Sequence, residues 1–317
     1  MEIPVCLKSE LDHFSTIPIQ TAMEHAKYIT YLPINNNLTS DTISFEVSGS
    51  PEEAIDLYHS ELLLDVQILK TDNTYPLVDA LYGPVNNFAR SLFSGHELSL
   101  NEEVVSSVPN MSHMGAYIET LLNYGHSAQN GLLDVGWVLD KADTLDNVEV
   151  AVPQANPAYN LNTGMLKRRE QLAAGTIWRM YTKVPSDLAH QTLLIPPKVG
   201  LKLTLTRAKD TFALLSSENP FQYKTRIEAA SLRIRKVKLD SEFLLAHEAM
   251  IMRRNALIPY IESTVNEFGI ANGSSTWNRQ DVFRGLVPKK MILGLVDSSA
   301  VIGDLKKNPY NFVTGGI

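Results

Sequence analysis

The stretch Leu201-Lys-Leu-Thr-Leu-Thr206 contains the pattern that decides the fold of this chain. Its three leucines alternate with lysine and threonine, so an extended backbone would place the leucines on one face and the polar side chains on the other. A period of two residues is typical of a strand that is buried on one side. We therefore predict a half-buried β-strand over these residues.

The same alternation recurs along the chain, at 43–47, 62–68, 98–100 and 227–239. In the last of these segments the apolar face slips by one residue after Ile234, which predicts a β-bulge near Arg235-Lys236. Two further strands are expected near 258–265 and over 290–296, the second with both faces apolar. Strands therefore account for most of the predicted regular structure.

Two segments have helical spacing instead. Tyr117, Leu121 and Tyr124 lie three to four residues apart within 113–124, and Gly125 follows as a stop signal. Ser241 is a capping-type residue at the start of the second predicted helix, 241–255.

Frequent turns and short helices argue against repeated βαβ units. We predict an all-β fold, a jelly-roll barrel or sandwich with short helices. The predicted divisions are an N-terminal arm (1–20), a first jelly roll (21–240), a helical linker (241–256) and a final region (257–317).

Composition excludes several classes of protein. Of the 317 residues, 44% are hydrophobic, which is enough for a sizeable core. Because the net charge is -7, we do not expect the protein to wrap nucleic acid around its overall surface. The single cysteine, Cys6, cannot form an intrachain disulfide. No apolar run is long enough for a membrane span, and Met1 to Asp12 lacks the apolar core of a signal peptide.

A search for catalytic and ligand-binding patterns assigns no residue. His247-Glu248 lacks a second histidine, because position 251 is isoleucine. Phosphate loops, dinucleotide fingerprints and nucleophile elbows are missing from the sequence. The acidic pairs Glu52-Glu53 and Glu102-Glu103 are interpreted as solvated side chains. We therefore predict no catalytic, cofactor-binding or metal-binding residues, and a protein that is not an enzyme.

Two basic sets have the chemistry to contact phosphate. They are Lys167-Arg168-Arg169, and Arg233, Arg235, Lys236 and Lys238. The second set follows a predicted strand, where alternate charges would face outward. For both sets we favour a solvated or subunit-contacting face over a nucleic-acid site.

The segment from Gly83 to Gly125 combines several signals. It contains three bulky apolar side chains that we expect in the core, Phe88, Leu92 and Phe93, and Asn101-Glu102 can turn a hairpin. The helix predicted at 113–124 would then pack on the rim of the barrel.

This segment resembles the major capsid proteins of Maverick/Polinton-type DNA elements and the related adintoviruses. Further matches follow in the same order along the chain, from about residue 15 onward. They are Ser48-Gly49-Ser50, Lys167-Arg168-Arg169-Glu170, Leu205 to Asp210 with Phe212, Arg235 to Leu239, Ala246-His247, Gly294 to Asp297, and Lys306 to Phe312.

The resemblance implies a double jelly roll whose homotrimers tile an icosahedral shell, together with other capsid proteins such as a penton subunit. It also implies a place in the virion capsid, inside the host cell before release, and it implies no catalytic residues or cofactors. The family continues beyond the Lys306–Phe312 motif, whereas only about 60 residues follow the linker here. We therefore predict that 257–317 is the start of a second, truncated jelly roll.

Two alternatives stay open. A minor capsid protein of the vertex would share the jelly roll but form pentamers. A carbohydrate-binding or hydrolytic β-sandwich would need clustered aromatics or two converging carboxylates, and Trp137, Trp178 and Trp277 are scattered along the sequence.

Overall fold

The computed structural model describes residues 21–35, 37–77, 80–148, 161–274, 276–280, 282 and 287–312. The predicted N-terminal arm, with Cys6, lies outside these residues. The strands are β1 (Met23–Tyr31), β2 (Thr42–Val47), β3 (Glu53–Lys70), β4 (Tyr82–Pro84), β5 (Phe93–Leu100), β6 (Glu103–Val108), β7 (Trp178–Lys183), β8 (Leu201–Arg207), β9 (Leu214–Ser216) and β10 (Tyr223–Leu239). The α-helices are α1 (Phe88–Ser91), α2 (Ser112–Asn123), α3 (His126–Gln129), α4 (Thr163–Gln171), α5 (Asp210–Ala213), α6 (Ser241–Ile251) and α7 (Ser298–Ile302), and the 3-10 helices are η2 (Leu133–Val135), η3 (Ala173–Gly175) and η4 (Asp187–His190).

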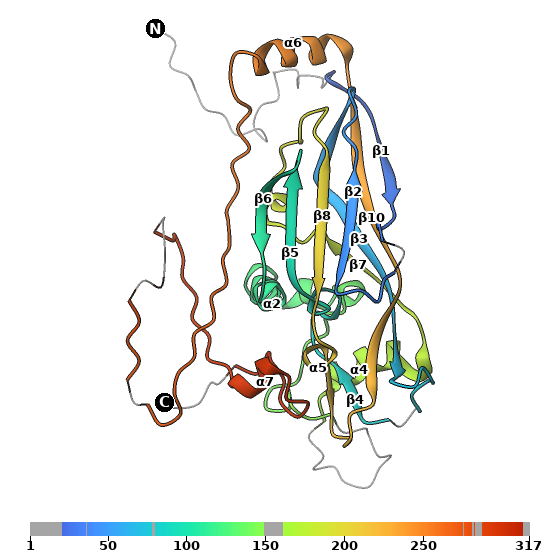
Figure 1. Ribbon diagram of the computed structural model, residues 1–317, viewed down its shortest axis with the longest axis vertical. Coiled ribbons are helices and arrows are strands. Elements are labelled where there is room, and N and C mark those ends of the chain that lie inside the picture. The colour runs from blue at the N-terminus through green and yellow to red at the C-terminus, as the bar shows by residue number, and fades with distance from the viewer. Residues whose placement is uncertain are drawn as a thin grey trace.

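Two four-stranded antiparallel sheets form the body of the protein (Figure 1). Their strand orders are β1-β10-β3-β7 and β2-β8-β5-β6, while β4 and β9 pair in a small separate ribbon. If the eight sandwich strands β1, β2, β3, β5, β6, β7, β8 and β10 are counted 1 to 8 along the chain, the two sheets have the orders 1-8-3-6 and 2-7-4-5. This order is that of two Greek keys folded into a jelly roll. The predicted all-β jelly roll with short helices is confirmed.

The alternating pattern that predicted the strands also builds the core between the sheets. In the pairing of β2 with β8, Ile43, Phe45 and Val47 lie opposite Leu205, Leu203 and Leu201. All six side chains are buried. Burying a side chain of this size contributes about 1.5–3 kcal/mol, so this strand pair alone stabilises the sandwich strongly.

The long strand β10 pairs irregularly with β3. Its register shifts between Ile227 and Ala229, and again between Arg233 and Arg235. At the second shift β10 advances by two residues while β3 moves from Glu61 to Asp56. The predicted irregularity therefore occurs slightly before Arg235-Lys236, and the extra residues belong to β3 rather than to β10.

The Gly83–Gly125 segment forms β4, α1, the β5–β6 hairpin and α2. Leu100 pairs with Glu103, so the hairpin loop consists of Asn101 and Glu102 alone. Both loop residues have positive φ values, 47° and 72°, as a two-residue type I′ turn requires. The predicted hairpin is confirmed.

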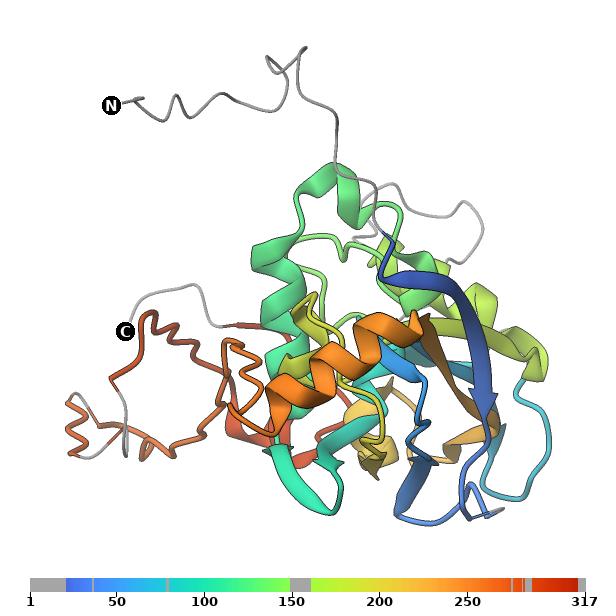
Figure 2. The same ribbon diagram turned by 90° about the horizontal axis from the view of Figure 1, so that it is seen from above.

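The helix α6 lies across one end of the sandwich (Figures 1 and 2). Its N-cap is Asp240, whose side chain accepts hydrogen bonds from the backbone N–H groups of Glu242 and Phe243 at 3.0 and 3.2 Å. The prediction of Ser241 as the cap was wrong by one residue. Aspartate is the better acceptor because its charge also favours the helix N-terminus.

Neither strand predicted beyond α6 forms. Residues 258–265 and 290–296 are extended, and their described residues pair with the rest of the chain only through an isolated bridge between Val296 and Phe312. Neither segment pairs with an edge strand of the two sheets. The predicted start of a second jelly roll at residue 257 stays a prediction.

After α6 the described part of the chain runs beside the sandwich, extends away from the body as a long loop and leads back to α7 (Figures 1 and 2). Ile258 and Tyr260 pack against the sandwich core, and the Tyr260 hydroxyl donates to the Val105 carbonyl of β6 at 2.7 Å. The loop is therefore fixed to the body at its departure and at its return.

Candidate interaction surfaces

A second apolar cluster closes the end of the sandwich opposite α6, where α2, α4, α5 and α7 gather (Figure 1). We call it the base cluster. Its buried members are Val85, Met114, Tyr117, Trp137, Val148, Met165, Phe212, Leu215 and Tyr310. Most of these residues come from helices and loops rather than from the sandwich strands.

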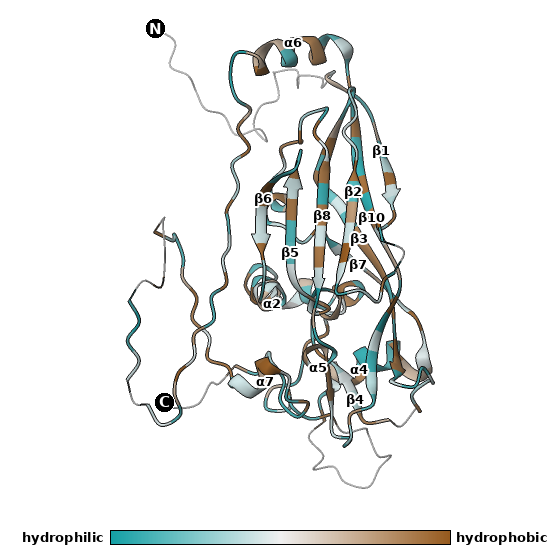
Figure 3. Cartoon of the chain, viewed as in Figure 1, coloured by the Kyte–Doolittle hydropathy of each residue, from teal (hydrophilic) through white to brown (hydrophobic). Residues whose placement is uncertain are grey.

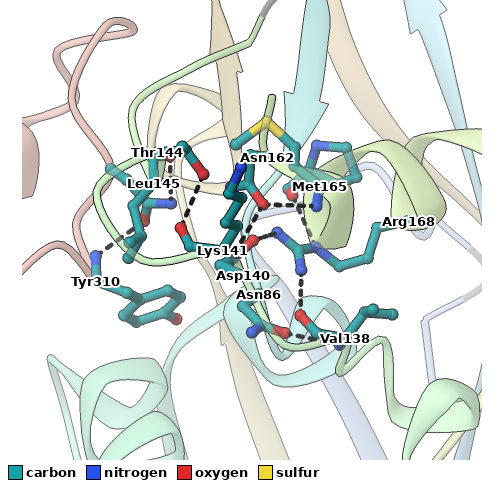
Figure 4. A network of polar contacts seen from close by, with 12 residues as sticks. Asn86, Val138, Asp140, Lys141, Thr144, Leu145, Asn162, Met165, Arg168 and Tyr310 are labelled. Carbon is teal, nitrogen blue, oxygen red and sulfur yellow. Dashed lines mark hydrogen bonds and ion pairs between the residues drawn. The ribbon is translucent and has the colours of Figure 1, made fainter. Parts of the chain in front are cut away.

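A buried arginine organises one side of the base cluster (Figure 4). The Arg168 side chain is fully buried and donates from Nε to the Pro84 carbonyl at 3.1 Å and from Nη1 to the Val138 carbonyl at 2.6 Å. Its Nη2 forms an ion pair with Asp140 at 2.7 Å. A buried ion pair is tolerated when further hydrogen bonds satisfy it, and here they tie α4 to β4 and to the 138–140 loop.

The prediction for Lys167-Arg168-Arg169 is therefore wrong for both arginines. Arg168 directs its guanidinium inward, and Arg169 is buried with its guanidinium 5.5 Å from the centre of the Tyr82 ring. Only Lys167 is exposed. Neither a phosphate contact nor a subunit contact by these two arginines fits this arrangement.

Two buried asparagines hold the same loop in place (Figure 4). The Asn86 Oδ1 accepts from the Val138 N–H at 3.1 Å. The Asn162 Oδ1 caps α4 by accepting from the Met165 N–H at 3.2 Å, and it also lies 3.4 Å from the Lys141 nitrogen. Isolated asparagines carry no sequence signal for such a role, so sequence reasoning did not identify them.

The chain's return path ends in the base cluster. We call residues 297–312 the anchor, and its deepest side chain is Tyr310, which is 1% exposed. The Tyr310 ring stacks on Tyr117 with centroids 4.0 Å apart, and its hydroxyl lies 2.6 Å from the Ser91 Oγ. Burial raises the pKa of the Tyr310 phenol, which therefore stays neutral. This docked tyrosine belongs to the Lys306–Phe312 motif.

A polar clamp accompanies the tyrosine. The backbone N–H of Asn308 donates to Asp146 Oδ1 at 2.6 Å, and its side-chain Nδ2 donates to the Leu145 carbonyl at 3.1 Å. Asn311 Nδ2 reaches the other Asp146 oxygen at 2.8 Å. The anchor thus combines a buried aromatic ring with a set of directional hydrogen bonds.

The basic residues of β10 are neutralised by neighbouring strands. Arg233 lies 3.6 Å from Glu61, and Lys238 lies 2.8 Å from Glu24. Arg235 pairs with Asp56 and also sits beside the His59 ring. Lys236 is buried, and its Nζ donates to the Ser48 carbonyl at 3.0 Å. The prediction that they form an outward-facing charged set holds only in part, because these charges are largely compensated within the sheet.

Two buried histidines lie close together along the chain. His96 on β5 contacts the Ser112 Oγ through Nδ1 at 2.7 Å, and His113 on α2 stacks on Phe212 with centroids 3.8 Å apart. Desolvation lowers the pKa of each to about 4, and for His96 the nearby Arg90 adds to the effect. Both imidazoles are therefore neutral at pH 7.

The described residues contain no group of three or more His, Cys, Asp or Glu side chains placed to hold a metal ion. His247 stacks on Phe243, and Glu248 pairs with Lys198. Of the acidic pairs, Glu53 forms an ion pair with Lys27 and Glu102 occupies the hairpin turn. No described helix is long and apolar enough to cross a membrane.

The tryptophans do not form a sugar-binding platform. Trp137 lies in the base cluster and Trp178 in the sandwich core, and both are buried. Trp277 lies on the protruding loop, where its ring contacts Phe268 at a centroid distance of 5.9 Å. The three rings therefore belong to three separate places.

Hydrophobic residues are frequent on α6 and on the segment that follows it (Figure 3), and large apolar side chains among them are exposed. The helix buries none of its residues, and Leu245 and Met252 beside it are 71% and 88% exposed. Beyond Met252, the exposed apolar residues are Leu257, Ile261, Ile270, Trp277, Val287, Met291, Ile292, Leu293, Leu295 and Ile302. Apolar surface of this extent is typical of a site that contacts another protein.

No protein-family model matches the chain. An uncharacterized protein of Caenorhabditis elegans is 25% identical over 240 residues, which cover 75% of this chain and 53% of that protein. The chain therefore spans about half the length of the relative it matches.

Among solved structures, the chain is similar to viral major capsid proteins. In the cryo-EM structure of the Sputnik virophage, a chain matches with a TM-score of 0.45 and 12% identity, over 76% of this chain and 53% of that one. The PBCV-1 protein VP54, fitted into a cryo-EM reconstruction of Sputnik, matches with a TM-score of 0.44 and 12% identity, over 74% of this chain and 46% of that one. The mavirus major capsid protein matches with a TM-score of 0.36 and 10% identity, over 75% of this chain and 51% of that one.

Proposed function

We propose that this chain is a structural subunit of the capsid of a DNA virus or a virus-derived mobile element. Its role would be self-association, with the sandwich as a rigid wall and the exposed apolar surfaces as contacts. The observation that carries the proposal is the jelly-roll strand order combined with α6, a helix that buries none of its own residues.

The charge distribution supports a protein contact rather than a nucleic-acid contact. The cations of β10 are paired with acidic neighbours on β1 and β3, and Arg168 is buried. Nucleic-acid binding relies on cations that are free to meet phosphates. The ordered sequence motifs from Gly83 to Phe312 support the capsid assignment independently of the charges.

The finer proposal is that the subunit is a major capsid protein of Maverick/Polinton or adintovirus type, forming homotrimers that meet a penton subunit in the virion. Within it, residues 257–317 would be the start of a second jelly roll. Residues 258–265 and 290–296 support this, because both segments have strand-like sequences but pair with no strand of the two sheets.

Light scattering of the purified full chain tests the proposal. We expect trimers, and shell-like particles at high concentration by negative-stain electron microscopy. A double variant, L245E/M252E, places charges on the exposed face of α6 and should shift the population toward monomers. The control, E242Q/H247Q, changes polar residues of the same helix and should leave assembly unchanged.

Other outcomes identify the alternatives. Pentamers in place of trimers would favour the minor capsid assignment. A strict monomer at high concentration, with unchanged behaviour of the charged variant, would contradict self-association. A glycan that binds this monomer would instead favour a carbohydrate-binding sandwich.

A further inference from the structure

The anchor is connected to the rest of the chain by an unusual linker. We call residues 266–295 the tether, and its described residues extend away from the body and lead back toward α7 (Figures 1 and 2). In the described part of the tether, ring contacts and hydrogen bonds join its residues to one another, as Arg279 and Trp277 do with Phe268. Near the end of the tether, Gly294 lies close to the Phe312 ring of the anchor. The tether therefore places few constraints on where the anchor docks.

The anchor itself makes specific contacts. Tyr310 fills a buried position between Tyr117 and Phe212, and Asn308 is held by the 145–146 backbone and side chain. This complementarity belongs to the anchor and its socket, which we define as Ser91, Tyr117, Leu145, Asp146 and Phe212. Every copy of the chain presents both halves, so the socket of one copy fits the anchor of another equally well.

We propose that the anchor is exchanged between copies of this chain, so that residues 297–312 of one subunit fill the socket of the next. The proposal rests on the self-association proposed above and names the segment that links the subunits. Exchange of an identical element needs no new interface chemistry, which makes it a low-cost route to an oligomer.

The uncovered surface of the tether favours exchange over docking within one chain. Val287 and Leu293 are 91% and 77% exposed, and Met291 and Ile292 are also exposed. A tether that crosses to a neighbour lies between two bodies, where these side chains become buried. Docking within one chain leaves them in water.

Charge favours the same arrangement. The described tether residues include Arg279, Lys289 and Lys290 but only one acidic residue, Glu267, which is a net charge of +2. The formal net charge of the whole chain is -7, so the remaining residues carry -9. A cationic tether is therefore attracted to the acidic body of a neighbour.

The tether is also long enough. Thirty residues span roughly 100 Å when extended. A domain of about 240 residues has a radius of gyration of about 18 Å. The anchor therefore reaches the socket of any subunit that packs against its own.

Cross-linking between two single-cysteine chains tests the exchange. Asn147 and Asn311 line the same surface hollow, one on the socket side and one on the anchor. In a C6S background, N147C and N311C chains with different tags are co-expressed and treated with a bifunctional maleimide. We expect a cross-linked heterodimer, because neither chain holds both cysteines.

Two controls make the result decisive. A chain carrying both N147C and N311C should be cross-linked either within one chain or between two chains. This product shows that the reagent spans the distance between the two cysteines. Adding Y310A to the N311C chain should reduce the heterodimer by at least tenfold, because the anchor loses its buried ring.

Oligomers by light scattering without a cross-linked heterodimer would overturn the exchange and leave self-association intact. A monomer by light scattering would instead overturn the proposed function together with the exchange.

Discussion

The sandwich core and the base cluster are both built of buried apolar side chains, but their residues come together in different ways. In the sandwich, partners such as Phe45 and Leu203 meet because two strands alternate apolar and polar residues in register. In and beside the base cluster, Arg168 of α4 meets Asp140 and Tyr310 meets Ser91, so each buried polar side chain depends on a partner from another part of the chain. The first depends on a repeated pattern, whereas the second depends on individual residues.

This difference predicts how each region responds to substitution. A sandwich position loses transfer energy and gains a small cavity when it is trimmed. A base position that loses one polar partner leaves another polar group buried without compensation, which costs more. The following substitutions compare the two regions directly.

The largest effect is expected for R168A. It would leave the Asp140 carboxylate buried without its cation, together with the carbonyls of Pro84 and Val138. We expect a loss of about 3–5 kcal/mol in the free energy of unfolding, measured by urea denaturation. The neighbouring K167A should change it by less than about 0.5 kcal/mol, because Lys167 is exposed. A loss below about 1 kcal/mol for R168A would contradict the proposed difference between the base cluster and the sandwich core.

The same contrast explains what could be predicted from the sequence. The strands containing Phe45, Leu64 and Leu203 follow from a two-residue period, and the hairpin follows from Asn101-Glu102. The register shift near Arg235 also left a visible slip in that period. A local pattern was sufficient in each case, because each strand alternation is a property of neighbouring residues.

The base cluster left no such trace. Arg168 stands in a basic triplet that is typical of a solvated face, and only the fold brings it to Asp140, 28 residues away in the chain. Tyr310 was noted as part of a motif, but its socket is assembled from α1, α2, α5 and the 145–146 loop. Long-range pairings of single residues cannot be inferred from periodicity, and the unpaired segments beyond α6 could not be placed for the same reason.

The second effect concerns pH. His96 and His113 have a folded-state pKa of about 4, against 6.5 when unfolded. Between these values the unfolded chain binds more protons, so stability falls as the pH decreases from 6.5 to 4. Each histidine should account for roughly 3 kcal/mol of this loss at most.

The pH contribution is measured as the slope of unfolding free energy against pH. H113F keeps the ring stacked on Phe212 but cannot titrate, so its slope should be shallower than that of the unmodified chain. M114L, which exchanges one buried apolar side chain for another on the same helix, is the control and should keep the original slope because neither side chain titrates. Equal slopes for H113F and the unmodified chain would contradict the assignment of a buried, neutral His113.

A smaller effect is expected for I68V in the sandwich. Ile68 is fully buried on β3, and the substitution removes one methyl group without leaving a polar atom unpaired. We expect a loss of about 0.5–1.5 kcal/mol by urea denaturation. The exposed V104A on β6 is the control, with a change close to zero. A loss as large as that of R168A would mean that the sandwich depends on single residues as strongly as the base does.

The smallest effect has the opposite sign. Glu102 occupies the second position of the β5–β6 turn with φ at 72°. Glycine adopts this backbone conformation freely and asparagine tolerates it, but for glutamate it is energetically unfavourable. E102G should therefore raise the free energy of unfolding by about 0.5–1 kcal/mol. N101G is the matched control and should give no gain, because asparagine already tolerates φ of 47° and its Oδ1 accepts a hydrogen bond from the Gly200 N–H at 2.8 Å that glycine would lose. If E102G instead destabilised the chain, the glutamate would have to make a contact that outweighs its backbone strain, and even this exposed turn would depend on a single side chain as the base cluster does.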